Sequence, residues 1–137
     1  MSMSLFAMAA AAAASHSVAI DHHGMQVQAN YTARLVVSAR TVGARTPNRM
    51  DMQRCKWTAR VEIDRSLAHG PALARTIATD PLASGSESAA CPSGDRFRKD
   101  IAERHQGQVQ AQLAAAVAQD RAPLLAELDM VRNLASN

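Results

Sequence analysis

The chain has 137 residues and a mass of 14.6 kDa, which is the size of one small domain and excludes a second one. Apolar residues make up 47% of it, but 29 residues are alanine and aromatic residues account for only 3%, so the hydrophobic core is expected to be thin. The net charge of +3, with a pI near 9.4, neither requires nor excludes an anionic partner.

The amino end carries an apolar run at residues 5–14, LFAMAAAAAA, followed by the polar residues 15–17. Because a bilayer core requires about 20 helical residues, this run is too short to span a membrane. Its length and the small residues after it are typical of a secretory signal peptide. Small residues permit cleavage after Ala14, Ser17 or Ala19, and the last leaves a polar segment of the usual length. We therefore predict a signal peptide over 1–19 and one domain over 20–137.

The sequence contains two cysteines, Cys55 and Cys91, which permit a single intramolecular disulfide. Closing a loop of roughly 35 residues would stabilise the fold by about 3 to 4 kcal/mol. A redox or nucleophilic thiol would require a CxxC spacing or a nearby base, and neither is visible. Arginine outnumbers lysine 13 to 2, which with the many alanines indicates a GC-rich bacterial genome. We predict a periplasmic or secreted bacterial protein; the alternative is a cytosolic protein with an alanine-rich leader, because residues 1–4 contain no lysine or arginine.

Two segments alternate apolar and polar residues with a period of two, which indicates strands with one buried face. In residues 25–40 the odd positions are apolar, and in residues 54–64 the odd positions from Cys55 to Ile63 are apolar. The segment between them, 42–51, contains glycine, proline and asparagine, so an antiparallel hairpin with a long tip is expected.

Residues 66–92 are interrupted by several turn formers. Within them, residues 73–79 are predicted as a third short strand, since two strands alone are marginal in water; one helical turn is the alternative. The SGSES segment at 84–88 lacks periodicity and is predicted to be a mobile loop.

From Asp95 the period becomes helical, with Ser93 or Asp95 as the N-cap. Pro123 is expected in the first turn of a second helix that begins at Asp120 or Arg121, and one kinked helix is the alternative. The order of elements predicts an α+β fold, in which a small antiparallel sheet of two or three strands packs against a long C-terminal helix and a shorter terminal helix. The apolar stripe of the first helix consists of Phe97, Ile101, His105, Val109, Leu113 and Val117.

No catalytic site and no cofactor are predicted, because the sequence contains no phosphate-binding loop, dinucleotide fingerprint, zinc-protease motif or serine nucleophile motif. One metal site is conditional on processing. If cleavage falls after Ala19, His22 becomes the third residue of the mature chain, where a free amine and an imidazole can chelate Cu(II) or Ni(II). Otherwise this segment is expected to be a solvated tail.

Positive charge concentrates between Arg34 and Arg65, where eight basic and three acidic residues give +5 and leave −2 for the rest. Glu62 and Asp64 are interpreted as ion-pair partners of Arg60, Arg65 or a cross-strand arginine. The polar face of the hairpin is predicted to form an anion-binding patch, although an ordinary solvated sheet face would carry similar charges. The patch residues are Arg34, Arg40, Arg54, Lys56 and Arg60.

These features predict a noncatalytic binding or accessory protein of the bacterial cell envelope, whose partner is an anionic envelope component or an acidic protein. Nucleic acid is not expected as a partner, because no aromatic residues interleave the bases on that face. Membrane contact would be peripheral at most, and the sequence leaves the oligomeric state open. The alternatives are a secreted hydrolase inhibitor that inserts the 42–51 tip, an alanine-rich helical self-association module, and an enzyme of an unrecognised kind.

Overall fold

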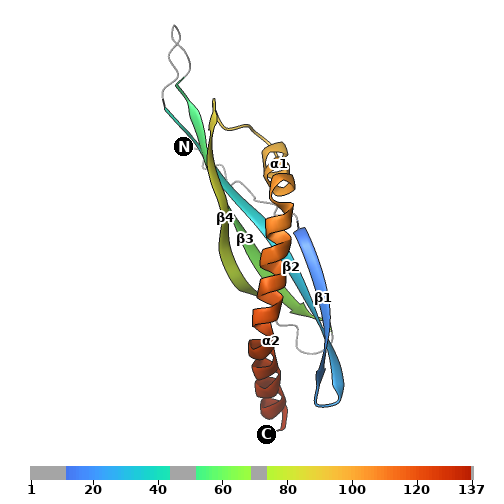
Figure 1. Ribbon diagram of the computed structural model, residues 1–137. Helices are drawn as coiled ribbons and strands as arrows, with labels where there is room; N and C mark the ends of the chain where they lie inside the picture. Colours follow the sequence, from blue (N-terminus) through green and yellow to red (C-terminus); the bar gives the residue numbers. More distant parts are fainter. Residues whose placement is uncertain (1–11, 44–51, 69–73, 137) are drawn as a thin grey trace.

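The computed structural model of the protein describes residues 12–43, 52–68 and 74–136, in which two helices lie along one face of a four-stranded antiparallel sheet (Figure 1). The strands neighbour one another in chain order. The α+β class is confirmed, but the sheet has four strands rather than the two or three expected. The elements are β1 (Ala12–His22), β2 (Met25–Val42), β3 (Arg54–Leu67), β4 (Arg75–Ser88), α1 (Arg96–Arg104) and α2 (Gln106–Ser136).

The central hairpin of β2 and β3 forms as the alternation predicts, with Ala33 opposite Ile63 and antiparallel pairing throughout. Odd positions of both strands face the helices, and even positions face the other way. The predicted tip falls mostly outside the described residues, which end at 43 and resume at 52. The buried positions of the two strands are Val27, Ala29, Tyr31, Ala33, Leu35, Val37, Cys55, Trp57, Ala59, Val61, Ile63, Arg65 and Leu67.

Strand β1 is an addition to the expected sheet and includes residues 12–19, which were assigned to the leader. It pairs with β2 from Ala12 opposite Arg34 to His22 opposite Met25. Ile20 is buried, and Val18 packs against the core. The sequence of β1 consists largely of alanine and serine and therefore shows no clear strand pattern. These small side chains bury little apolar area at each position.

Strand β4 continues through the SGSES segment to Ser88, so the predicted loop at 84–88 is wrong. The physical reason is the pairing of Gly85 with Trp57 on β3. A Cβ atom at position 85 would lie 2.7 Å from the indole ring, so only glycine gives the ring room to lie against β4. The glycine that suggests a loop in the sequence is therefore a packing residue of a strand.

The helices divide at a different place from the one predicted. The break is at His105, between α1 and α2, and Pro123 lies inside α2 rather than in the first turn of a new helix. Pro123 removes one backbone hydrogen bond, but Leu124 and Leu128 just beyond it are buried in the core. Packing therefore holds the helix together through the proline. Asp95 occupies the N-cap of α1 without a side-chain capping bond.

Within the described part of the chain, neither helix combines the length and the hydropathy that a membrane span requires.

Candidate functional site

All the cationic residues of the predicted anion-binding patch lie on the face of the sheet turned away from the helices. We call it the open face; it comprises the even-numbered residues of β2 and β3 and the β4 residues paired with them. No described helix covers it. The five residues of the predicted patch, all at least partly exposed on this face, are Arg34, Arg40, Arg54, Lys56 and Arg60.

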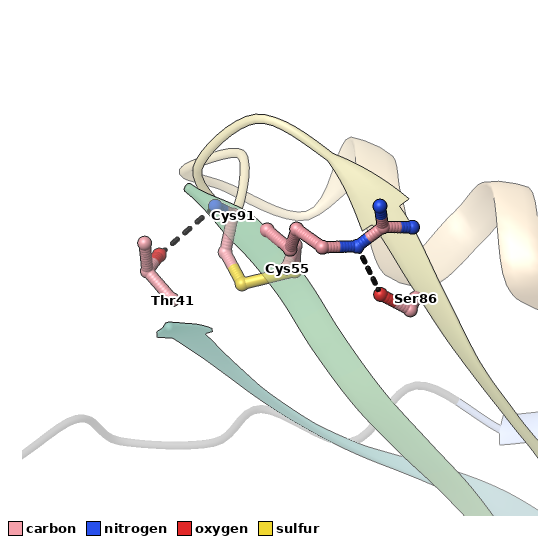
Figure 2. Close-up of a disulfide and its surroundings, with 5 residues drawn as sticks. Thr41, Cys55, Ser86 and Cys91 are labelled. Atoms are coloured by element: carbon pink, nitrogen blue, oxygen red, sulfur yellow. Dashed lines mark hydrogen bonds between the residues drawn. A yellow bond between two sulfur atoms is a disulfide. The ribbon is translucent and has the colours of Figure 1, made fainter. Parts of the chain in front are cut away.

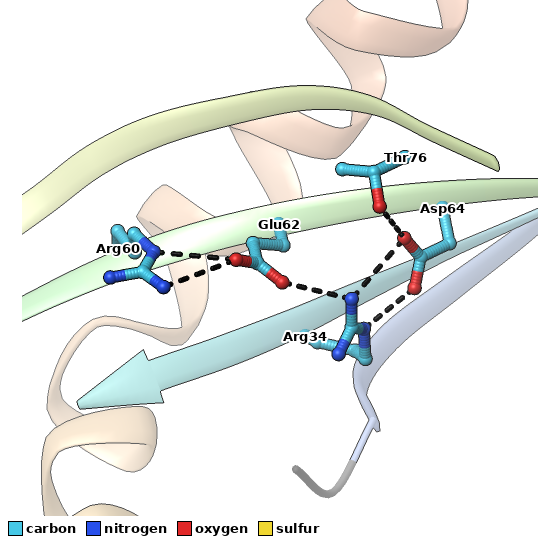
Figure 3. A network of polar contacts seen from close by, with 5 residues as sticks. All are labelled: Arg34, Arg60, Glu62, Asp64 and Thr76. Carbon is cyan, nitrogen blue, oxygen red and sulfur yellow. Dashed lines mark hydrogen bonds and ion pairs between the residues drawn. The ribbon is translucent and has the colours of Figure 1, made fainter.

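In the middle of the open face, two of these arginines are bound to carboxylates (Figure 3). The Arg34 guanidinium donates from Nε to Asp64 at 2.6 Å and from Nη2 to Glu62 at 2.8 Å. Arg60 donates to the other Glu62 oxygen at 3.3 Å, and the Thr76 hydroxyl donates to Asp64 at 2.7 Å. The predicted pairing of Glu62 and Asp64 with Arg60 and a cross-strand arginine is confirmed, and the charges in this network cancel.

These contacts change the acidity of Asp64. Partial burial raises the pKa of its carboxyl, but the hydrogen bonds from Arg34 and Thr76 together with the positive charge of Arg34 outweigh burial and leave the pKa below its ordinary value. Asp64 is therefore charged at neutral pH and keeps Arg34 occupied. Arg34 and Arg60 add no excess positive charge to the open face.

The remaining cations lie at the end of the hairpin nearest its tip. Arg40 lies directly opposite Lys56, and Arg54 donates from Nε to the Ser86 hydroxyl at 3.0 Å. Among the residues that the structure describes, these cations have no carboxylate partner. We call Arg40, Arg54 and Lys56 the tip cluster.

A shallow depression of about 690 Å³ adjoins the tip cluster. Its walls combine cationic side chains with hydroxyl groups that can donate hydrogen bonds to an anion. It is lined on the open face by Ser38, Arg40, Lys56, Thr58, Ser84 and Ser86, and Ala39, Trp57 and Gly85 add an apolar part to its lining.

The predicted disulfide joins Cys55 of β3 to Cys91 of the segment that leads into α1, with their Cα atoms 4.6 Å apart (Figure 2). The Cys91 amide also donates to the Thr41 hydroxyl at 3.0 Å. Cys55 lies between Arg54 and Lys56 in β3, with its side chain on the opposite face. The disulfide therefore fixes the end of the sheet that presents the tip cluster.

A buried ionic cluster connects the covered face of the sheet to α2, and the sequence analysis missed it. Arg65 is fully buried and donates to Asp120 at 2.7 and 2.6 Å; it also donates to Glu127, which contacts Arg75 as well. The Tyr31 hydroxyl donates to Asp120 at 2.7 Å. Burial first, and then the Asp120 hydrogen bond, raise the pKa of Tyr31 well above its ordinary value.

A sequence signal for this cluster exists. Arg65 continues the odd positions of β3 beyond Ile63, and Asp120 follows Leu113 and Ala116 on the buried stripe of α2. The buried face of β3 carries a positive charge and the buried face of α2 a negative one. Because these two faces pack together, the sequence indicates a buried ion pair. Because Arg65 and Asp120 are inaccessible to a ligand, we interpret the cluster as an anchor for α2.

His22, the conditional metal ligand, lies at the end of β1, where it contacts α2 rather than extending as a solvated tail. The chain shows no detectable match to a known protein family, to a curated protein or to a solved structure.

Proposed function

We propose that the protein is a noncatalytic binding protein that works in an oxidising compartment outside the cytoplasm and docks its tip cluster onto an anionic partner. The observation that carries the proposal is the tip cluster itself: three cations on an uncovered sheet face, beside a depression whose lining includes four hydroxyl groups, with no carboxylate partner among the described residues.

The position of the cations supports a binding role. Arg40 and Lys56 are directly opposite on adjacent antiparallel strands, and like charges at such positions destabilise a sheet. A bound anion would relieve that repulsion. The arginines can bind phosphate or carboxylate oxygens with two parallel hydrogen bonds, while lysine supplies a point charge. The disulfide and the strand pairing hold these groups in place before the partner arrives.

The shape of the site favours an extended partner. The open face is broad and its depression is shallow, which suits a phosphate- or carboxylate-bearing envelope polymer, a layer of lipid headgroups or an acidic protein surface. Tyr31 and Phe97 lie on the helix side of the sheet, and Trp57, although it lines the depression, is only 6% exposed, so these rings offer little stacking surface for bases. This distribution disfavours single-stranded nucleic acid.

The proposed compartment depends on the disulfide, because such bonds persist in oxidising environments. The structure also bears on the proposed processing site. Cleavage after Ala19 would remove residues 12–19 from β1 and leave β2 paired on that side only through residues 20–22, so most of its edge would be exposed. Cleavage after Ala14 would keep Ser15 to His22 paired with β2. We therefore propose that export removes residues 1–14, and that the mature bacterial protein is periplasmic or secreted.

Vesicle binding tests the docking proposal. The full chain is mixed with vesicles containing anionic lipid, and in parallel with a soluble anionic polymer, at ionic strengths of about 0.01 M and 1 M, where the Debye length is about 30 Å and 3 Å. The test variant carries Arg40→Gln and Lys56→Gln. The control carries Lys99→Gln and Arg121→Gln, which remove the same charge from exposed positions on α1 and α2.

We expect the wild type and the control to bind at low salt, and the test variant to bind at least about tenfold more weakly, which corresponds to about 1.4 kcal/mol. High salt should weaken wild-type binding. Equal loss in the two variants would show that only net charge matters, and salt-independent binding would exclude an electrostatic contact; either result contradicts the proposal.

A further inference from the structure

Two histidines and an aspartate meet at the end of β2 opposite to the tip cluster. His22 and His23 lie at the turn between β1 and β2, beside the C-terminal part of α2 (Figure 1). Their Nε2 atoms lie 2.7 Å and 3.1 Å from the same oxygen, Oδ1 of Asp129. One potential ligand atom from each of the three residues lies within 4.8 Å of the others. These contacts join segments more than 100 residues apart in the chain.

The backbone of the turn brings both imidazole rings to one side. Adjacent residues of a strand point to opposite faces, so His22 and His23 would normally diverge. His23 instead adopts a left-handed conformation with φ of 52°, and Gly24 follows with φ of 81°. Such a conformation is uncommon for a residue other than glycine, although histidine tolerates it better than most. As a result the two rings lie edge to face, with their centroids 4.4 Å apart.

We propose that His22, His23 and Asp129 bind a divalent transition-metal ion, with Zn²⁺ as the best fit. Two imidazole nitrogens and one carboxylate oxygen form a donor set typical of zinc. Zinc bonds of 2.0 to 2.1 Å place the ligands of a tetrahedron about 3.3 Å apart, close to the observed spacings between each histidine and Asp129. The convergence of both rings on one oxygen atom distinguishes this arrangement from a single surface ion pair.

The environment of the three residues permits metal entry. The His22 side chain is 13% exposed and is held by its surroundings, whereas His23 and Asp129 are 54% and 53% exposed. Water can therefore reach the remaining coordination position. Imidazole ligands favour zinc, copper or nickel over magnesium and calcium, which prefer oxygen donors. A bound ion would crosslink the β1–β2 turn to α2.

Isothermal titration of the full chain with ZnCl₂ at neutral pH tests the site, with MgCl₂ as the comparison ion. In the full chain residue 20 is an internal residue of β1, so it offers no free amine for the conditional Cu(II) or Ni(II) chelate. The variants are Asp129→Asn, which keeps the shape of the side chain, and His23→Asn, which keeps a residue that tolerates the left-handed conformation. His16→Gln, at an exposed histidine of β1, is the matched control.

We expect one zinc ion per chain, at least about tenfold weaker binding in both site variants, and unchanged affinity in the control. Zinc should also raise the melting temperature of the wild type and the control, because ligands that bind the native state stabilise it, and should have little effect on Asp129→Asn. Absence of zinc binding, or equal affinity in the wild type and Asp129→Asn, would overturn the proposal. The circular dichroism spectrum of each variant shows whether the variant is folded.

Discussion

Arg65 and Asp120 are the two charged residues buried among the described part of the chain, at 0% and 5% exposure, and they neutralise one another. Removing Asp120 leaves the buried Arg65 with Glu127 as its remaining carboxylate partner, and the loss of the main partner costs far more than the pair contributes. The Nε of Arg65 already lacks a hydrogen-bond partner, so without Asp120 only Glu127 would compensate the guanidinium. The stability of the helix and sheet interface should therefore depend on keeping or replacing the pair as a unit.

Asp120→Ala is expected to lower the free energy of unfolding by about 3 to 5 kcal/mol, because it leaves the Arg65 charge buried without its main partner. Urea denaturation measures this loss. The double variant Arg65→Met with Asp120→Leu should cost less than Asp120→Ala alone, since it removes both charges from the core. A loss below about 1 kcal/mol for the single variant would show that Asp120 is not the main partner of a buried Arg65 and would contradict this account.

Tyr31 is the only tyrosine of the chain, so the ultraviolet absorbance of phenolate reports on it alone. Because its pKa is raised in the folded state, the unfolded chain ionises first as the pH climbs above about 10. This group therefore stabilises the fold fully below that pH and less at higher pH. Alkaline titration of native protein should show no phenolate until unfolding, and Tyr31→Phe should remove this part of the pH dependence. A native-state midpoint near 10 would contradict the buried hydroxyl.

At the scale of elements, the C-terminal half of β4 packs closely on Trp57 at a position where only glycine fits, Gly85. Gly85→Ala is expected to destabilise the fold by about 1 to 3 kcal/mol, because the new Cβ would overlap the Trp57 ring. Gly107→Ala is the matched control, since a Cβ there meets nothing within 4 Å in helix α2 and should be neutral or stabilising by up to about 1 kcal/mol. Fluorescence of Trp57, the only tryptophan, follows unfolding in both variants. Equal stabilities would show that the ring does not pack on β4.

The elements also show what the sequence could and could not predict. β2 and β3 were predictable because their alternation is strict, and the same alternation placed the patch residues on one face. β1 was missed because an alanine-rich segment resembles a leader as much as a strand, and β4 was shortened because Gly85 resembles a loop residue. The predicted helix start near Pro123 was wrong because packing of Leu124 and Leu128 outweighs the missing hydrogen bond, so α2 continues through the proline.

The candidate sites divide in the same way. The face of each cation follows from the period of two, but the neutralisation of Arg34 by Glu62 and Asp64 depends on cross-strand register, which the sequence does not specify. The contact of His22 with Asp129 depends on how α2 lies over the sheet, more than 100 residues later. The local sequence pattern therefore predicted the face on which each side chain lies. Strand register and helix packing determine which of these side chains come into contact.

At the scale of the whole molecule, the two ends of the sheet are held differently. The disulfide secures the end with the tip cluster, and the histidine and aspartate contacts secure the end with the β1–β2 turn. Between them, α2 is anchored through Asp120 and Glu127. The core, built mainly of valine, leucine and isoleucine among the described residues, thus receives a crosslink and buried ionic contacts in addition to apolar packing, which a small domain needs for stability.

The proposed docking role assumes that the disulfide forms in an oxidising compartment, and the proposed cleavage after Ala14 keeps most of β1 paired with β2. The intact mass of the protein, isolated from the extracytoplasmic fraction with free thiols alkylated before denaturation, tests both points most directly. We predict a chain that begins at Ser15, carries no alkyl group and is lighter by two hydrogen atoms than its reduced form. A full-length chain recovered from the cytoplasm with Cys55 and Cys91 both alkylated would contradict the proposed compartment and the docking role that depends on it.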